Sequence, residues 1–416
     1  MTTRTDTGEE TAPARRWPLL CVLMIGGFTT ALNVTMLSPL LTRIAAEFSI
    51  SEAKAGQLAT VTTLSSGVMA LIAAPWMDRY SRGAWIRFEC ALLLLGSLLS
   101  AFAPSFAVLL MARIIAGIGG AIIGANCLAA VADLYTDPHA RNRALGLIGT
   151  AFTLGAVVGL PLLTLIAEAA SWRWAIGLLV PLTLIVVVGS FQLPRSAHAP
   201  GGSLWRGWAT GYARVLRSAE TVWLLLAMAA CMVVWFGWLI YFGAYSERVY
   251  AIGAGTLSLL FLVGGGSEIV ANTVAPWLLR WYPARWVGAG AAAVLMLNLL
   301  VVGVVYTRDW ALFPFIAIAS AAGSFIYLCI NILLLDSLPG ARGAVMSLQS
   351  GSIEIGGAVG VAFAGGALAY FDDYETVYRL LGVLAPLMVI GMVLSLRRGP
   401  ATGTTVGAAA PSGAKR

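Results

Sequence analysis

Residues 74–79 of this chain read Ala-Pro-Trp-Met-Asp-Arg, and residues 275–280, which lie 201 positions later, read Ala-Pro-Trp-Leu-Leu-Arg. The same offset aligns three further features: Trp85 with Trp286, Ala140-Arg141 with Ala341-Arg342, and Gly155-x-x-x-Gly159 with Gly356-x-x-x-Gly360. A single offset that holds across separated segments is typical of an internal repeat. We therefore expect two parallel copies of one structural unit.

The composition excludes a water-soluble fold. Of the 416 residues, 59% are hydrophobic and only 11% are charged, and the mean hydropathy is +0.86. Soluble domains carry roughly 25% charged residues, because they need a polar exterior. The chain is therefore expected to be an integral membrane protein of the all-α class, in contact with the lipid bilayer over most of its length.

The apolar runs predict how the chain is divided. A helix that crosses a bilayer needs about 20 mostly apolar residues. Twelve such runs occur, at about 17–40, 56–77, 86–104, 106–134, 144–168, 172–193, 221–246, 254–278, 286–306, 311–335, 343–370 and 374–396. The expected organisation is a cytoplasmic tail (1–16), a six-helix bundle (17–193), a cytoplasmic linker (194–220), a second six-helix bundle (221–396) and a flexible cytoplasmic tail (397–416).

The distribution of Lys and Arg predicts the orientation. If both termini are cytoplasmic, the inner segments carry 19 of the 26 basic residues and the outer segments carry 6. Positively charged residues are retained on the cytoplasmic side of membranes. We therefore expect both termini in the cytoplasm, and the cell membrane, most simply a bacterial cytoplasmic membrane, as the location.

Several kinds of site are excluded by the residue types present. The five cysteines lie inside apolar runs, and the two histidines, His139 and His198, lie in polar connectors, so we expect no disulfide framework, no metal site and no cofactor. The basic residues are scattered, which argues against nucleic acid as a partner. No grouping of a nucleophile with a base occurs, so we do not expect an enzyme with catalytic residues.

Three motifs resemble those of the major facilitator superfamily, and the likeness covers about residues 17–398. The segment after the second run resembles the hallmark G-x-x-x-D-R-x-G-R-R/K through Asp78, Arg79 and Arg82, although Ala74, Ser81 and Gly83 depart from it. In the fourth run Arg113, Gly117 and Gly119 match R-x-x-Q-G-x-G-A, with Ala116 in place of glutamine. In the fifth, Gly155 and Gly159 match part of the motif of the twelve-helix drug–proton antiporter branch.

This resemblance implies a fold of two six-helix bundles, a cytoplasmic latch and a central cavity. The latch residues it implies are Asp78, Arg79, Arg82, Asp133 and Arg141, with Asp78 beside the start of helix 11 and Arg82 paired with Asp133. The cavity is lined in the family by helices 1, 4, 7 and 10, which supply Asn33, Asn126, Trp235, Trp238, Tyr241, Tyr327 and Asn331 as candidates. For the aromatic residues of helix 7, the alternative is packing against neighbouring helices or an interfacial belt. The glycines of both Gly-x-x-x-Gly motifs allow close helix packing, and we place them at the family's helix 5–helix 8 and helix 2–helix 11 seams between the bundles.

Three ionisable residues lie deep in predicted spans: Arg113, Glu268 and Glu354. Charges within a membrane are costly and are functional candidates by default. Arg113 is the shallowest, at a depth from which its long side chain can reach the membrane surface. It is also a candidate for proton coupling, because a positive charge favours the charged form of a nearby carboxyl group. Because removal from water makes a carboxyl group hold its proton more readily, the two glutamates are candidates to carry protons; the alternative for each is a structural hydrogen bond to a neighbouring helix.

Together these features predict a secondary active transporter, a monomer that exports a small, moderately hydrophobic compound in exchange for protons by alternating access. The alternative is an uptake permease or facilitator for a small metabolite such as a sugar or an organic acid. The first span carries Asn33 and no acidic residue, which keeps this alternative open.

Overall fold

The computed structural model describes residues 13–77, 81–135, 137–193 and 204–395, and their regular structure is helical apart from one isolated bridge between Val302 and Tyr306. We call α1–α11 the N half and α13–α19 the C half; α12 joins them. The N half contains α1 (Pro13–Thr35), η1 (Ser38–Leu40), α2 (Leu41–Glu47), α3 (Glu52–Ala55), α4 (Gln57–Met77), α5 (Arg82–Ala101), α6 (Phe106–Gly120), α7 (Ile123–Leu134), α8 (Pro138–Val157), α9 (Gly159–Ala169), α10 (Trp172–Gly177) and α11 (Leu179–Ser190).

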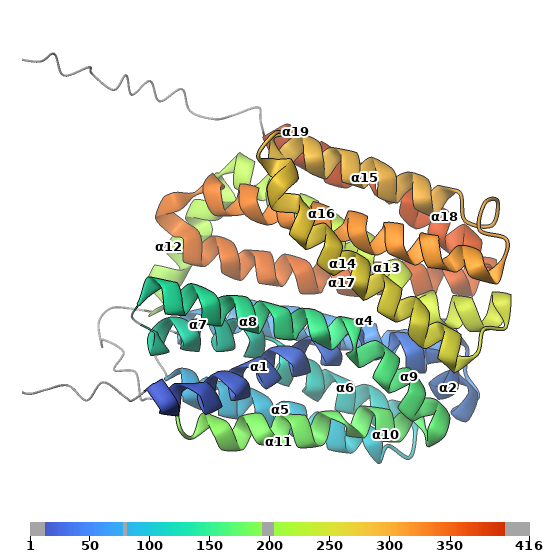
Figure 1. The fold of residues 1–416 in the computed structure, drawn as a ribbon, viewed down its shortest axis with the longest axis horizontal. Coiled ribbons are helices and arrows are strands. Elements are labelled where there is room, and N and C mark those ends of the chain that lie inside the picture. Colours follow the sequence, from blue (N-terminus) through green and yellow to red (C-terminus); the bar gives the residue numbers. More distant parts are fainter. Residues whose placement is uncertain (1–12, 78–80, 136, 194–203, 396–416) are drawn as a thin grey trace, which may run out of the picture.

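The linking helix α12 (Leu204–Arg217) leads into the second half. The C half contains α13 (Ala219–Tyr250), α14 (Ala254–Leu279), α15 (Ala284–Leu300), η2 (Asp309–Ala311), α16 (Leu312–Ser337), η3 (Pro339–Ala341), α17 (Arg342–Phe371), α18 (Tyr374–Leu384) and α19 (Pro386–Leu394). Figure 1 shows the two halves side by side, with α12 at one end of the molecule and α2 at the other. We call these the α12 end and the α2 end.

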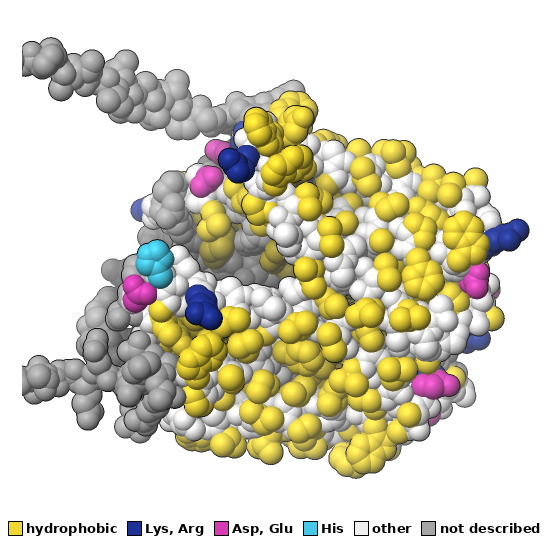
Figure 2. Space-filling model, in the orientation of Figure 1, with side chains coloured by type: hydrophobic (Ala, Val, Ile, Leu, Met, Phe, Trp, Pro, Cys, Tyr) yellow, Lys and Arg dark blue, Asp and Glu magenta, His cyan; other side chains and the backbone are white. Residues whose placement is uncertain are grey.

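The number of membrane-spanning helices agrees with the sequence. Within the described ranges, eleven helical segments are long and apolar enough to cross a membrane, and the shorter apolar helix α15 makes a twelfth. Figure 2 shows apolar side chains over the flanks of the molecule, while charged side chains gather toward its two ends. This distribution is that of a protein whose flanks face lipid and whose ends face water, and the expected all-α membrane fold is confirmed.

Several spans are interrupted, and proline explains two of the interruptions. α8 ends at Val157, four residues before Pro161, and α10 ends at Gly177, four residues before Pro181. Because proline lacks the N–H that would bond to the carbonyl four residues earlier, the helix breaks there. The break between α6 and α7, at Ala121 and Ile122, has no proline.

The two halves meet along two seams. α4 packs against α17 over much of their length, and α14 packs against α8 and α9. These are the helix 2–helix 11 and helix 5–helix 8 contacts expected from the sequence. Small residues allow the close approach: an added Cβ at Gly67 would lie 3.0 Å from the Cβ of Glu354, and one at Gly265 would lie 2.4 Å from Val157.

The glycines assigned to these seams from the sequence lie elsewhere, so that assignment was wrong. An added Cβ at Gly155 would lie 2.8 Å from the carbonyl oxygen of Phe28, and Gly159 faces Leu32, both on α1. Likewise Gly356 and Gly360 face α13. The motifs therefore bring the first and fifth spans of each half together. Each half is one copy of the repeat, and the repeated motif makes the same contact inside each copy.

Gly360→Ala is expected to destabilise the fold by about 1–3 kcal/mol, the usual cost of overpacking. An added Cβ there would lie 2.1 Å from the carbonyl oxygen of Val233, and backbone of a packed helix cannot move aside cheaply. The measurement is unfolding of the purified protein in micelles. Gly366→Ala is the matched control on the same helix, because nothing lies within 4 Å of its added Cβ; equal stability of the two variants would contradict this packing.

Candidate functional site

At the α2 end the two halves are joined by direct side-chain contacts. The Ser38 hydroxyl donates to the carbonyl oxygen of Leu239 at 2.5 Å, and Thr42 donates to the carboxylate of Glu247. Arg248 pairs with Glu52 at 2.5 Å. The two halves are therefore closed against each other at this end.

The α12 end is different. Figure 2 shows the surface hollowed between the two halves on the side where α12 lies. α12 itself is held against the C half: Tyr212 and Ser347 share a hydrogen bond of 2.7 Å, and Arg214 donates to the carbonyl oxygen of Gly340 at 3.3 Å. The structure is therefore closed at one end and open at the other.

Arg113 lies fully buried inside the N half. Its guanidinium donates to the backbone oxygen and side-chain oxygen of Asn33, at 3.2 and 3.0 Å, and to the hydroxyl of Thr62 at 3.2 Å. Arg113 therefore does not reach toward the membrane surface, although its depth would allow this, because these acceptors on α1 and α4 hold it inside. Asn33 is also buried and serves Arg113 rather than an open cavity.

Asn126 belongs to a second buried polar group, which includes a residue that sequence reasoning missed. Its side-chain amide donates to the Glu89 carboxyl at 2.9 Å, and the backbone N–H of Ile122 donates to the same carboxyl. Both side chains are completely buried, so Asn126 does not face an open cavity as expected. Glu89 therefore binds the backbone at the break between α6 and α7, where no proline accounts for the interruption.

Glu89 escaped notice because the third span was predicted to begin at residue 86, which places this carboxyl at the membrane surface. The helix begins at Arg82 instead, so that Glu89 lies two turns inside it. Ser81 caps this helix, with the N–H of Ala84 donating to its hydroxyl. A serine three positions before the first apolar residues is the signal that gives the earlier start.

Glu89→Ala is expected to lower the free energy of unfolding by about 1–3 kcal/mol, because it leaves buried hydrogen-bond donors unpaired. The loss of packed side-chain atoms is expected to lower it further. Glu89→Gln, which keeps an acceptor oxygen, is expected to cost less. The measurement is denaturant unfolding in mixed micelles. Glu168→Ala, at an exposed ion pair with Arg43, is the control; a similar loss in both alanine variants would contradict a structural role for Glu89.

One of the two glutamates predicted from the sequence lies at a seam. Glu354 is half-buried on α17 against Gly67 of α4; the Ser66 hydroxyl donates to its carboxyl, and Oε2 has no partner among the described residues. Glu268 is half-buried on α14, and its helical position lies between that of Gly264, which faces Ile316 of α16, and that of Gly265, which faces Val157 of α8. Glu354 thus lies where one half meets the other, and Glu268 lies on the helix that forms the second seam.

Two of the cavity candidates on α13, Trp238 and Tyr241, are buried. Trp238 packs edge-on against Phe242 and Phe315, with centroid distances of 5.9 and 6.1 Å, and the Tyr241 hydroxyl is wedged against Gly56 and Gly365 at the α2 end. The expectation that Trp238 and Tyr241 line an open cavity is therefore wrong for this state.

Trp235, Tyr327 and Asn331 are accessible. Trp235 is half-buried and its ring lies over Gly323 of α16, and Tyr327 is 41% exposed. Asn331 donates to the carbonyl oxygen of Tyr327 at 3.0 Å and accepts from the Gln349 amide at 2.5 Å. These contacts place neutral polar and aromatic groups together between α13, α16 and α17. In the described part of the chain, no three His, Cys, Asp or Glu residues lie close enough to hold a metal ion.

The sequence of this chain was compared with models of known protein families. The model of the Major Facilitator Superfamily matches residues 23–360, which is most of the chain. The chain belongs to the major facilitator superfamily. The members of this superfamily are transporters, which fits two six-helix halves closed against each other at one end only.

Individual relatives within the superfamily are distant. A probable sugar efflux transporter of Mannheimia succiniciproducens is 25% identical over 378 residues, with 88% of this chain and 92% of that protein covered. A puromycin resistance protein of Streptomyces alboniger is 27% identical over 236 residues, with 53% and 47% covered. The chain matches half or less of the length of the first such relatives.

Among solved structures, a bacterial homologue of the human lysosomal transporter Spinster, in an inward-facing and unoccupied conformation, has the same fold. Its TM-score is 0.66 at 16% identity, with 92% of this chain and 95% of that chain covered. The structural match therefore extends over both halves.

The superfamily's cytoplasmic hallmark is only partly described. Arg82 Nε lies 3.7 Å from a carboxylate oxygen of Asp133, so the structure brings these two residues together. Both belong to the N half, however, so this pair does not itself join the halves. Arg141 lies in the first turn of α8, and Asp78 and Arg79 lie outside the described residues.

Proposed function

We propose that this superfamily member is a secondary active transporter that exports a small, moderately hydrophobic compound in exchange for protons by alternating access. The observation that carries the proposal is the position of Glu354 at the α4–α17 seam, with Glu268 on α14 as the second candidate. If the halves rock against each other, the surroundings of Glu354 change. A group that alternates between a wet and a dry surrounding takes up and releases a proton, because removal from water favours the neutral form.

The open end supports an inward-facing state. The distribution of Lys and Arg favours a cytoplasmic position for both termini and for the α12 end, and this is the end at which the surface is hollowed. The closed α2 end then faces outward, through the contacts of Ser38 and Arg248. In this orientation a substrate enters from the cytoplasm, as export requires.

The accessible groups favour a neutral, moderately hydrophobic substrate. Trp235 and Tyr327 offer aromatic surfaces, and Asn331 and Gln349 offer amides that fix orientation. Arg113 is the one basic residue predicted deep in a span, and its donors are engaged by Asn33 and Thr62. A phosphorylated substrate would find no free cation among these groups.

Asp133→Asn is expected to slow transport by at most about fivefold, because its pair with Arg82 is partly exposed and contributes roughly 0–1 kcal/mol. Asp78→Asn is expected to slow transport more, because the family resemblance places that carboxylate at the start of α17, where the helix dipole favours negative charge. Initial rates in reconstituted vesicles, normalised to folded protein, decide this. Wild-type rates in Asp78→Asn would contradict the latch.

The alternative function is uptake or facilitated diffusion of a small metabolite such as a sugar or an organic acid. It is favoured by the absence of an acidic residue from α1, where Asn33 instead holds Arg113. Under either function we propose that the protein acts as a monomer in the cytoplasmic membrane of a bacterium.

The substrate class is tested in inside-out membrane vesicles that contain the full chain. Labelled puromycin and labelled sugars are offered separately, with and without an acidic lumen. Export of a hydrophobic compound predicts uptake of puromycin into acidic vesicles, with loss of the signal when a protonophore is added. Uptake of sugars alone would reject the hydrophobic substrate class, and uptake that ignores the pH gradient would reject proton coupling.

A further inference from the structure

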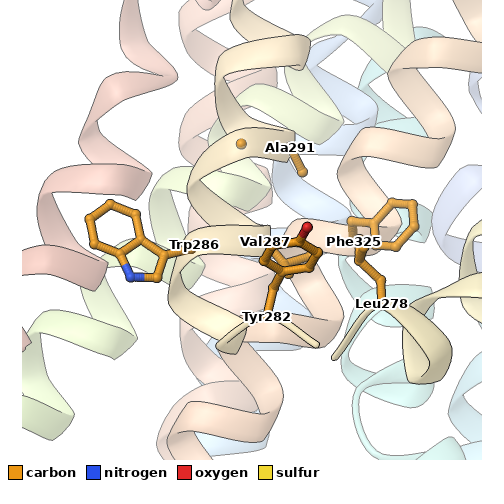
Figure 3. Close-up of a pocket in the computed structure, with 7 residues that line it drawn as sticks. Leu278, Tyr282, Trp286, Val287, Ala291 and Phe325 are labelled. Atoms are coloured by element: carbon orange, nitrogen blue, oxygen red, sulfur yellow. The ribbon is translucent and has the colours of Figure 1, made fainter. Parts of the chain in front are cut away.

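A second candidate binding site lies on the flank of the C half, away from the seams. α14 and α15 each pack along α16 but scarcely touch each other, so a groove runs between them with α16 as its floor. The groove has a volume of about 340 Å³ and is lined by Leu278, Tyr282, Trp286, Val287, Gly290, Ala291 and Phe325. Figure 3 shows Tyr282, from the connector before α15, beside Val287 of α15, with Leu278 and Phe325 across from them.

The groove is open because small residues line its inner part. Nothing lies within 4 Å of a Cβ added at Gly290, and Ala291 follows it along α15. The lining is apolar apart from the Tyr282 hydroxyl. Tyr282 lies in the connector between α14 and α15, at the end of these helices away from the α2 end. We call this end of the groove its mouth. The site therefore accepts an apolar group whose polar end lies near Tyr282.

The groove takes up part of the depth of one leaflet of a bilayer. Along α15 its lining residues run from Trp286 to Ala291, which is about 7.5 Å at roughly 1.5 Å per residue, and Tyr282 lies in the connector before this helix. The hydrocarbon core of a bilayer is about 30 Å thick, so the groove takes about half of the length of an acyl chain in one leaflet. Trp277, Trp281, Tyr282 and Trp286 are 61, 71, 59 and 68% exposed around the mouth, as interfacial aromatic residues are.

The charge at the mouth favours an anionic headgroup. Arg280 is exposed, stands in the chain between the lining residues Leu278 and Tyr282, and forms no ion pair within the described ranges. Arg285, in contrast, is engaged by Glu220 at 3.2 Å. One unpaired cation at the interface attracts anionic lipids, which are enriched in the cytoplasmic leaflet.

We infer that this groove binds one anionic phospholipid, with an acyl chain between α14 and α15 and the headgroup phosphate at Arg280. Lipid tails are as apolar as the groove, so fit and charge rather than the hydrophobic effect select the ligand. The inference uses the proposed function only for the orientation of the α12 end, and lipid binding is measured without transport, so that the two can fail separately.

The test is native mass spectrometry of the full chain, titrated in detergent with phosphatidylglycerol or with phosphatidylcholine. Wild-type protein is expected to retain one phosphatidylglycerol about fivefold more tightly than phosphatidylcholine, as one interfacial cation allows. Arg280→Gln is expected to abolish the preference, and Gly290→Leu, which fills open space, is expected to reduce retention of both lipids. Arg308→Gln and Gly366→Leu are controls at an exposed arginine of the α2 end and at an open glycine of α17.

Four outcomes would overturn the inference. The first is equal retention of the two lipids by the wild type, and the second is unchanged retention in Gly290→Leu. Displacement of phosphatidylglycerol by the transported substrate would assign the groove to the transport path. A wild-type dimer that is lost in Gly290→Leu would show that the groove is a contact between copies of the chain.

Discussion

Glu354→Gln is expected to abolish substrate accumulation driven by a proton gradient, while substrate binding is preserved. Glutamine keeps the size of the side chain and an oxygen that accepts from Ser66, but it cannot take up or release a proton. Because Glu354 lies at the α4–α17 seam, relative motion of the halves changes its surroundings. Glu268→Gln is expected to have the same kind of effect if protons pass by the second seam.

The measurement is accumulation in proteoliposomes at matched protein content, with an imposed pH gradient and then with a substrate gradient alone. In Glu354→Gln, we expect accumulation driven by the pH gradient to be lost, and movement of substrate down its own gradient to continue. Glu168→Gln, at an exposed pair, is the control. Undiminished proton-driven accumulation in the Glu354→Gln and Glu268→Gln double variant would show that neither residue carries the proton.

Trp238→Ala is expected to destabilise the C half by about 3–5 kcal/mol, the usual cost of removing a large buried side chain. Trp238 is fully buried between Phe242, Phe315 and Trp235, so its loss leaves a cavity in an aromatic core. Trp235→Ala, one turn away, is expected to cost less stability, because its ring is half-exposed over Gly323.

The two variants therefore separate packing from binding. If the exposed face of Trp235 contacts substrate, Trp235→Ala is expected to weaken binding by about 1–3 kcal/mol in the folded protein. Unfolding in micelles gives the stability of each variant, and substrate titration of the purified protein gives its affinity. A greater loss of stability in Trp235→Ala than in Trp238→Ala would contradict the positions of these rings.

The fold was predictable because it depends on features that are continuous along the chain. Apolar runs of about 20 residues and a repeat at 201 positions give the number of spans and their parallel arrangement without any knowledge of side-chain contacts. The seams followed from the family resemblance. The partners of single glycines did not, because Gly155 and Gly356 contact helices whose rotation about their own axes the sequence leaves open.

The candidate site was predictable only in part, for the same reason. Being deep in a span does not tell whether a polar residue faces a cavity or another helix. Asn33 and Asn126 form hydrogen bonds inside the N half, with Arg113 and Glu89, whereas Tyr327 and Asn331 are accessible. Glu89 was missed by a shift of four residues in the start of one helix, which changes a surface carboxyl group into a buried one.

The central claim is that protons move opposite to the substrate, and the direction of proton movement tests it most directly. Liposomes that contain the wild-type protein, a trapped pH indicator and the substrate are diluted into substrate-free buffer, with the membrane potential clamped. Exchange predicts that the lumen becomes acidic as the substrate leaves, and that Glu354→Gln lacks this signal. A lumen that becomes alkaline, as in cotransport, or a pH that does not change while the substrate leaves, would contradict the account.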